Sequence, residues 1–288
     1  PLLIGSVLTA VICTVMLITN SYRKLERIIE GFVSLIALAY LVEVNMVNVD
    51  LAAAGIGWVD PKIPNESMLV ILSILGAVIM PHNLFLHSEI IQSRQFNTQD
   101  PSIMKRQLRY EFLDTLFSMG IGWMINSAMI LLAAAVFFTH GIEVTELEQA
   151  EELLRPLIGP AAGTIFAIAL LFAGFASSAT AGMAGASIFA GMFGESYDMK
   201  DFHTRLGLAL TYIPALLLIV FVTDSFQALL ISQMFLSLQL PITIFLQLYM
   251  TSSRKVMGQY ANHTYTNVLL WGIGIVVTVM NIYLLIVG

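Results

Sequence analysis

The chain has 288 residues, of which 58% are hydrophobic and only 11% are charged, whereas soluble domains carry roughly 25% charged residues. Its net charge of −6 excludes the basic surface expected of a nucleic-acid-binding protein, so we expect no nucleic-acid partner. The single cysteine, Cys13, excludes an internal disulfide framework and a cysteine-rich metal site. The composition therefore favours a chain that is surrounded by lipid.

Eight stretches are apolar over the roughly 20 residues that a helix needs to cross a bilayer. They cover about residues 1–20, 28–49, 67–92, 112–139, 157–193, 206–222, 226–250 and 266–287. Runs of this length are helices, because only helices and closed barrels satisfy their backbone in lipid. We therefore expect an all-α integral membrane protein, with residues 1–288 in a single transmembrane domain. The chain starts inside an apolar stretch without Met, so we interpret it as part of a longer protein without a signal peptide here.

The basic residues are distributed unevenly between the loops. Eleven of the 13 Lys and Arg residues follow the first, third, fifth and seventh predicted helices: Arg23, Lys24, Arg27, Arg94, Lys105, Arg106, Arg109, Lys200, Arg205, Arg254 and Lys255. The positive-inside rule places these loops in the cytoplasm. We expect a multi-pass protein of the cell membrane, with Pro1 and Gly288 on the external side.

Small residues concentrate in the stretch 157–193, where Gly174, Gly182 and Gly185 lie among alanines and serines. Small side chains let neighbouring helix backbones approach closely in membranes. We expect this helix to make close contacts with its neighbours.

The third stretch contains Met80-Pro81-His82. Pro81 has no N–H, and its ring clashes with the carbonyl of Ala77, four residues back. We predict that helical hydrogen bonding lapses between about residues 76 and 81, helped by Gly76, and that the Ala77 oxygen then lies beside the Met80 thioether. Many transporters bind ions and substrates at such breaks near the midplane. An oxygen with a soft sulfur favours Mn²⁺, Fe²⁺ and softer ions over Mg²⁺ or Ca²⁺.

Three titratable residues follow the break: His82, His87 and Glu89. Ionisable groups inside a membrane segment are expensive and mark ion or proton pathways, so we expect these residues to line a proton or water path. Their spacing is not the His-Glu-x-x-His pattern of zinc proteases. Because the sequence also lacks a recognisable Ser/His/Asp or paired-carboxylate arrangement, we do not expect an enzyme. In the seventh stretch, Gln233 and Ser237 are four residues apart and share a helical face, which we predict turns toward Met80.

Three motifs resemble the Nramp family of divalent-metal transporters: MPHNLFLHS at 80–88, RKLE at 23–26 and SQMFLSLQLP at 232–241. The resemblance implies a LeuT-like inverted-repeat transporter fold, with about eight transmembrane helices present and the first three of the family's eleven missing. It also implies that the Ala77 carbonyl, Met80 and Gln233 are metal ligands. The family's Asp-Pro-Gly-Asn ligand motif does not occur in this chain, so we expect only half of the site here.

The chain departs from the family pattern at three positions. Ile12 stands where the family usually has an acid, Leu208 where we expect an arginine, and Ala186 where a glutamine is usual. Because Ile12 and Leu208 stand where the family has charged residues, we predict weak or absent proton coupling.

The resulting hypothesis is a monomeric secondary transporter that imports Mn²⁺, Fe²⁺ and Cd²⁺ across the lipid bilayer. The metal ion is then the substrate, and no cofactor is expected. Two alternatives stay open at this point: a Mg²⁺ carrier of the same fold, and a membrane metal sensor that does not transport.

Overall fold

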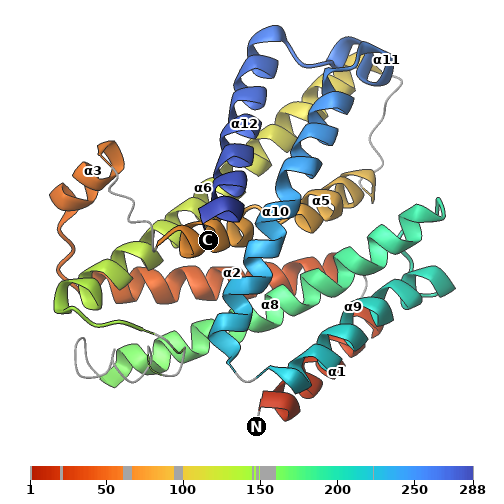
Figure 1. Cartoon of the computed structure of the whole chain (residues 1–288). Helices are drawn as coiled ribbons and strands as arrows, with labels where there is room; N and C mark the ends of the chain where they lie inside the picture. Colours follow the sequence, from red (N-terminus) through yellow and green to blue (C-terminus); the bar gives the residue numbers. More distant parts are fainter. Residues whose placement is uncertain are drawn as a thin grey trace. The chain divides into compact units, whose positions relative to one another are not determined.

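The computed structural model describes residues 2–19, 22–60, 67–93, 100–144, 146, 149, 160–222 and 224–287 (Figure 1). These residues form helices and connecting turns, with no strand in the part of the chain described, so the predicted all-α class is confirmed. The chain divides into two compact units. One comprises Pro1–Pro61 with Phe85–Phe221, and the other comprises Lys62–Leu84 with Val222–Gly288. The prediction of a single transmembrane domain stays a prediction.

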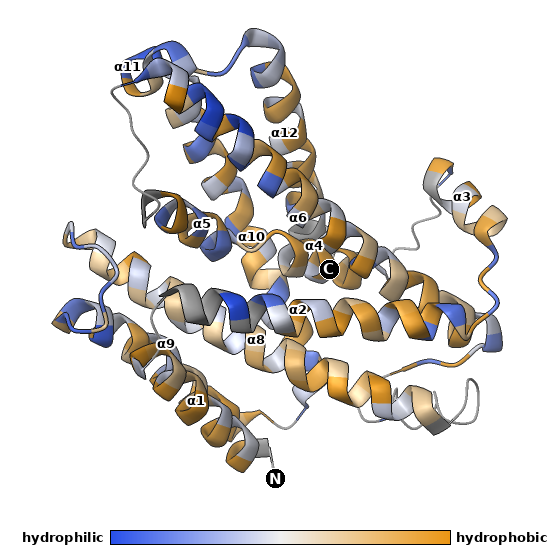
Figure 2. Ribbon diagram, turned by 180° about the vertical axis from the view of Figure 1, so that it is seen from behind, coloured by the Kyte–Doolittle hydropathy of each residue, from blue (hydrophilic) through white to orange (hydrophobic). Residues whose placement is uncertain are grey.

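The first unit is built around a long, small-residue helix. Its elements are α1 (Leu2–Thr19), α2 (Tyr22–Asn45), α3 (Leu51–Val59), most of α5 (Pro81–Ser93), α6 (Pro101–Val136), η2 (Phe138–His140), α8 (Pro160–Met192) and α9 (Phe202–Phe221). Helix α8 packs against α1, α2 and α9, and α6 packs against α2. The α8–α9 pair and α2 can be followed in Figures 1 and 2.

Close packing of α8 against α9 depends in part on two glycines of α8. A Cβ at Gly182 would collide with the Tyr212 ring, and one at Gly185 would collide with Thr211. The Tyr212 hydroxyl donates to the Ser178 carbonyl at 2.8 Å, which satisfies a polar group between the helices. The prediction of close contacts is therefore confirmed at these glycines, whereas a Cβ at Gly174 would meet nothing.

The second unit comprises α4 (Met68–Val78), the first residues of α5, α10 (Ser225–Ser252), α11 (Arg254–Met257), η3 (Gly258–Tyr260) and α12 (Thr264–Val287). Helix α10 packs against both α4 and α12. The Ser73 hydroxyl lies 2.9 Å from the Leu230 carbonyl oxygen, and the Ser237 hydroxyl donates to Asn281 Oδ1 at 3.0 Å. Polar side chains thus join α10 to each of its neighbours.

Several helix starts have a local cause in the sequence. Asp50, Asp100 and Asp224 cap α3, α6 and α10 by accepting backbone N–H groups of the first turn. The Ser102 hydroxyl, followed by the backbone N–H groups of Ser102 and Ile103, holds the pKa of Asp100 below its usual range. The α6 cap is therefore ionised at neutral pH.

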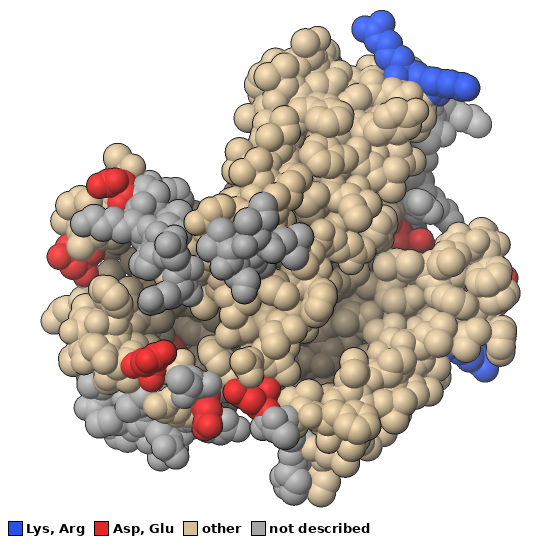
Figure 3. All heavy atoms as spheres, viewed as in Figure 1, with Lys and Arg blue, Asp and Glu red and all other residues tan. Residues whose placement is uncertain are grey.

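Six segments of the described chain are long and apolar enough to cross a membrane: Met68–Ile91, Pro101–His140, Ala161–Met192, Phe202–Phe221, Ser225–Ser252 and Thr264–Tyr283. The two remaining predicted spans coincide with α1, which is shorter, and with α2. Apolar residues dominate these helices (Figure 2), and most of the face drawn in Figure 3 is neither acidic nor basic. Large side chains such as Leu218 and Phe117 are exposed, as expected where lipid replaces water.

Candidate functional site

The predicted break in the third apolar stretch is present. Helix α4 ends at Val78, and α5 begins at Pro81. Ile79 has φ −114° and ψ 77°, outside helical values, and its N–H still reaches the Leu75 carbonyl at 3.0 Å. The chain resumes helical bonding when Asn83 N–H donates to the Met80 carbonyl at 3.0 Å. The helix is therefore interrupted as expected, but only at Ile79 and Met80, which is narrower than the predicted range of 76–81.

The break leaves the Ala77 carbonyl available as a ligand. Its intrahelical partner would be the N–H of residue 81, which proline lacks. Among the described residues no other hydrogen bond to this oxygen is found, and Ala77 is exposed in the structure. Met80, which lies between the two helices, is half-buried. A carbonyl oxygen and a thioether thus flank one backbone break.

Gln233 of α10 belongs to the same unit as Ala77 and Met80. The backbone of Gln233 fits against Gly76 so closely that a Cβ at residue 76 would collide with the Gln233 carbonyl. The Oε1 atom of Gln233 is buried and has no hydrogen-bond partner among the described residues. An unsatisfied buried amide oxygen costs about 1–3 kcal/mol, so Gln233 keeps an acceptor that a ligand could use.

Ser237 was predicted to share this face with Gln233. Its backbone N would also approach a Cβ at Gly76, at 2.9 Å. Its hydroxyl, however, is fully buried and donates to Asn281 of α12. Ser237 therefore joins α10 to α12, and its hydroxyl proton is already used in helix packing.

The donor atoms at the break define what could bind there. Ala77 and Gln233 supply neutral amide oxygens, and Met80 supplies a neutral sulfur. Among the described residues no group of three His, Cys, Asp or Glu side chains could hold a metal ion. A divalent cation at this break would therefore meet neutral ligands that select by softness, and its charge would need anionic ligands from elsewhere.

The titratable residues predicted to line a proton or water path all lie on α5. His82 is half-buried and His87 is exposed. Glu89 accepts the backbone N–H of Tyr197 at 3.3 Å. Tyr197 lies between α8 and α9, where burial, and next the charge of Asp198, raise its pKa to about 12, so its hydroxyl stays protonated at neutral pH. Glu89 thus ties α5 to the α8–α9 connection, a role that its sequence position did not suggest.

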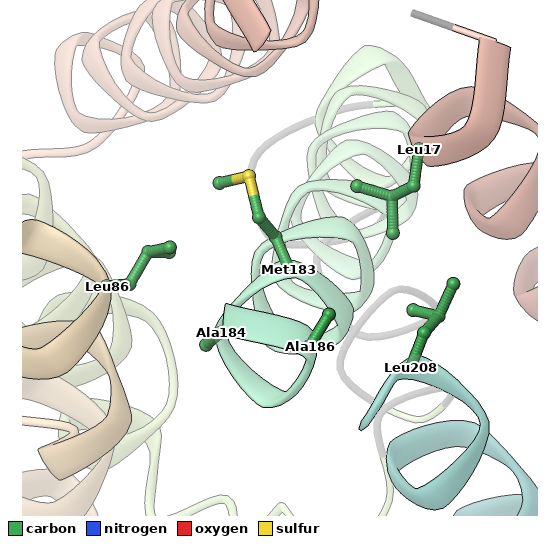
Figure 4. Close-up of a cluster of buried hydrophobic side chains, with 6 residues drawn as sticks. All are labelled: Leu17, Leu86, Met183, Ala184, Ala186 and Leu208. Carbon is green, nitrogen blue, oxygen red and sulfur yellow. The ribbon is translucent and has the colours of Figure 1, made fainter. Parts of the chain in front are cut away.

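Two of the three departures noted in the sequence meet in one apolar cluster. Ala186 of α8 and Leu208 of α9 are both buried in it. Figure 4 shows them with the other members, which are Leu17, Leu86, Met183 and Ala184. The third departure, Ile12 of α1, is 37% exposed. The side chains at these two positions are therefore packed among apolar neighbours.

Sequence reasoning overlooked one acidic residue. Glu43 of α2 is fully buried, and neither of its carboxyl oxygens has a hydrogen-bond partner among the described residues. The signal was available, because Glu43 is one of two acids within the apolar stretch 28–49.

The chain is similar to a known protein family and to several named proteins. A family model described as "Natural resistance-associated macrophage protein-like" (Nramp) matches residues 1–287. Three similar proteins carry the name divalent metal cation transporter MntH. That of Granulibacter bethesdensis is 34% identical, covering 99% of this chain and 64% of the relative. That of Caldanaerobacter subterraneus subsp. tengcongensis is 36% identical (91% and 62%), and that of Deinococcus radiodurans is 35% identical (99% and 65%). The chain thus spans less than two thirds of the length of these relatives.

Proposed function

Since the chain belongs to the Nramp family, which its match over residues 1–287 shows, we propose that it forms part of a secondary transporter for divalent transition-metal ions. Substrates of the class Mn²⁺, Fe²⁺ and Cd²⁺ fit the donor atoms at the α4–α5 break. The observation that carries this proposal is the broken helix, which leaves the Ala77 carbonyl without a hydrogen bond among the described residues and has Met80 in the break. The similar proteins named divalent metal cation transporter support it.

In this proposal three groups of the chain bind the ion. The Ala77 oxygen replaces a water of hydration without a change of charge, and the Gln233 amide supplies a second oxygen. The Met80 sulfur adds little binding free energy for a hard ion, although it displaces one of the waters that hydrate that ion. These three ligands are neutral, so the charge of the ion would need compensation from other groups.

The direct test is uptake of Mn²⁺ by vesicles that contain the protein, measured with a fluorescent indicator inside. A transporter moves Mn²⁺ faster than protein-free vesicles do, whereas a membrane metal sensor binds the ion without flux. Uptake of Mg²⁺ that Mn²⁺ does not inhibit would favour the Mg²⁺ carrier instead.

Replacing Gln233 by Ala is expected to lower the apparent affinity for Mn²⁺ about tenfold, the effect of losing roughly 1.4 kcal/mol of binding free energy. The maximal uptake rate should change less, since the helix packing at Gly76 uses the Gln233 backbone, which the substitution keeps. Gln227→Ala, an exposed glutamine of α10, is the matched control. Normal Mn²⁺ affinity in Gln233→Ala would remove Gln233 from the site.

We further propose that proton coupling is weak or absent, because Leu208 and Ile12 stand where the family pattern has charged groups, and Leu208 is buried in an apolar cluster. A pH indicator inside the vesicles should report little acidification during Mn²⁺ uptake. A robust, metal-dependent acidification that disappears in His82→Ala would contradict this proposal and assign the coupling to α5.

In this proposal the loops rich in Lys and Arg face the cytoplasm, following the positive-inside rule. His82 and His87 then mainly hydrate the path on the α5 side of the break.

A further inference from the structure

Glu43 is a buried acid that the metal site does not use. It lies in the last turns of α2, with no exposed surface and no hydrogen bond to either carboxyl oxygen among the described residues. Burying a carboxylate without a cation or N–H donors costs several kcal/mol, so such a group takes up a proton instead. Ionisable residues inside membrane segments are functional by default.

The helices packed against α2 offer Glu43 no compensating charge. These are α6 and α8. The sequence of α8 contains no acidic, basic or histidine residue, and α6 contains none after Asp114. The part of α6 that packs near Tyr40 is its later half, at Ala128, Leu132 and Val136.

Tyr40 and His140 are titratable groups near this end of α2 among the described residues. Tyr40 is one turn before Glu43 on α2 and belongs to the apolar cluster with Ala162 and Ala169 of α8. His140 follows α6. Its Nδ1 atom is within hydrogen-bond distance of the Val136 carbonyl oxygen, at 2.8 Å, and of the Thr139 hydroxyl, at 3.1 Å. Neither residue makes a hydrogen bond with Glu43 in the described structure.

We propose that Glu43 is a proton-binding site, which holds its proton while α2 is packed against α6 and α8. Release breaks the carboxyl O–H bond, leaves a carboxylate, and transfers the proton to water. Since a carboxylate is not tolerated at a buried position without a cation or N–H donors, release requires this packing to open. The metal ligands belong to the second unit and Glu43 to the first, so this inference does not depend on metal transport.

The test is infrared spectroscopy of the protein in lipid vesicles, which detects the C=O stretch of a protonated carboxyl group. The variants are Glu43→Gln and the matched control Glu30→Gln, which changes an exposed acid of the same helix. At pH 7 the wild type and Glu30→Gln should show the band, and Glu43→Gln should lack it. Raising the pH should remove the band and lower the thermal unfolding temperature of the wild type by several degrees, but not that of Glu43→Gln.

A wild-type spectrum without the band at pH 7, or a band that persists in Glu43→Gln, would overturn the proposal. If Glu43→Gln does not fold, Glu43→Met takes its place, since a neutral acid in an apolar cluster should accept an apolar side chain of similar length. Failure of both variants to fold would show an ionised, paired Glu43 and would equally overturn the proposal.

Discussion

Replacing Met80 by Ala is expected to change which ions the protein carries. The variant should transport Mn²⁺ with reduced affinity, lose most Cd²⁺ transport, and become more sensitive to inhibition by Ca²⁺ or Mg²⁺. The thioether attracts soft ions and, by displacing a water, disfavours hard ions. A difference of about 1.4 kcal/mol between the two classes gives tenfold discrimination, a reasonable scale for one ligand.

The measurement is uptake of Mn²⁺ and Cd²⁺ by wild type and Met80→Ala, each in competition with Ca²⁺ and Mg²⁺. Met250→Ala serves as the control, because Met250 is an exposed methionine of α10 in the same unit. Equal ion preferences in wild type and Met80→Ala would make Met80 a packing residue, and the case for a transition-metal substrate would lose its chemical basis.

Replacing Gly76 by Ala is expected to disrupt the second unit. The added Cβ would collide with the Gln233 carbonyl and come within 2.9 Å of the Ser237 backbone N. Because the obstacle is backbone, α4 and α10 must move apart. Overpacking of a core typically costs about 1–3 kcal/mol, and the same displacement would shift Gln233 away from the break. We expect a lower thermal unfolding temperature and loss of most Mn²⁺ uptake.

Gly272→Ala provides the matched control for this substitution. Gly272 lies in α12 of the same unit, and a Cβ there would meet nothing within 4 Å. Alanine is preferred over glycine inside a helix by up to about 1 kcal/mol, so this variant should keep or gain stability. Wild-type stability and uptake in Gly76→Ala would show that the contact between α4 and α10 is looser than described.

The break at Pro81 could be predicted from the sequence because its cause is local. A proline removes one N–H and displaces one carbonyl, whatever surrounds it. The helices were predictable for a related reason, since their apolar length alone determines whether they can cross a bilayer. Gly76, however, was expected only to ease the unwinding of the helix, whereas in the structure it also lets the Gln233 backbone approach.

What the sequence could not provide are the contacts between distant segments. Gly76 and Gln233 are far apart in the chain, and only the packing of α4 against α10 brings them together. The meeting of Ala186 with Leu208 likewise depends on α8 and α9 lying side by side. The prediction that Ser237 turns toward Met80 rested only on the helical face that it shares with Gln233. The hydrogen bond that the Ser237 hydroxyl donates to Asn281 could not be predicted from the sequence.

The central claim is that a divalent metal ion binds at the α4–α5 break through the Met80 sulfur. X-ray absorption at the cadmium edge, recorded on the protein loaded with Cd²⁺, reads the ligand atoms of the bound ion directly. We predict one sulfur in the coordination shell of the wild type and only oxygen or nitrogen in Met80→Ala, with Met250→Ala unchanged. A wild-type shell without sulfur, or a sulfur that persists in Met80→Ala, would contradict the claim.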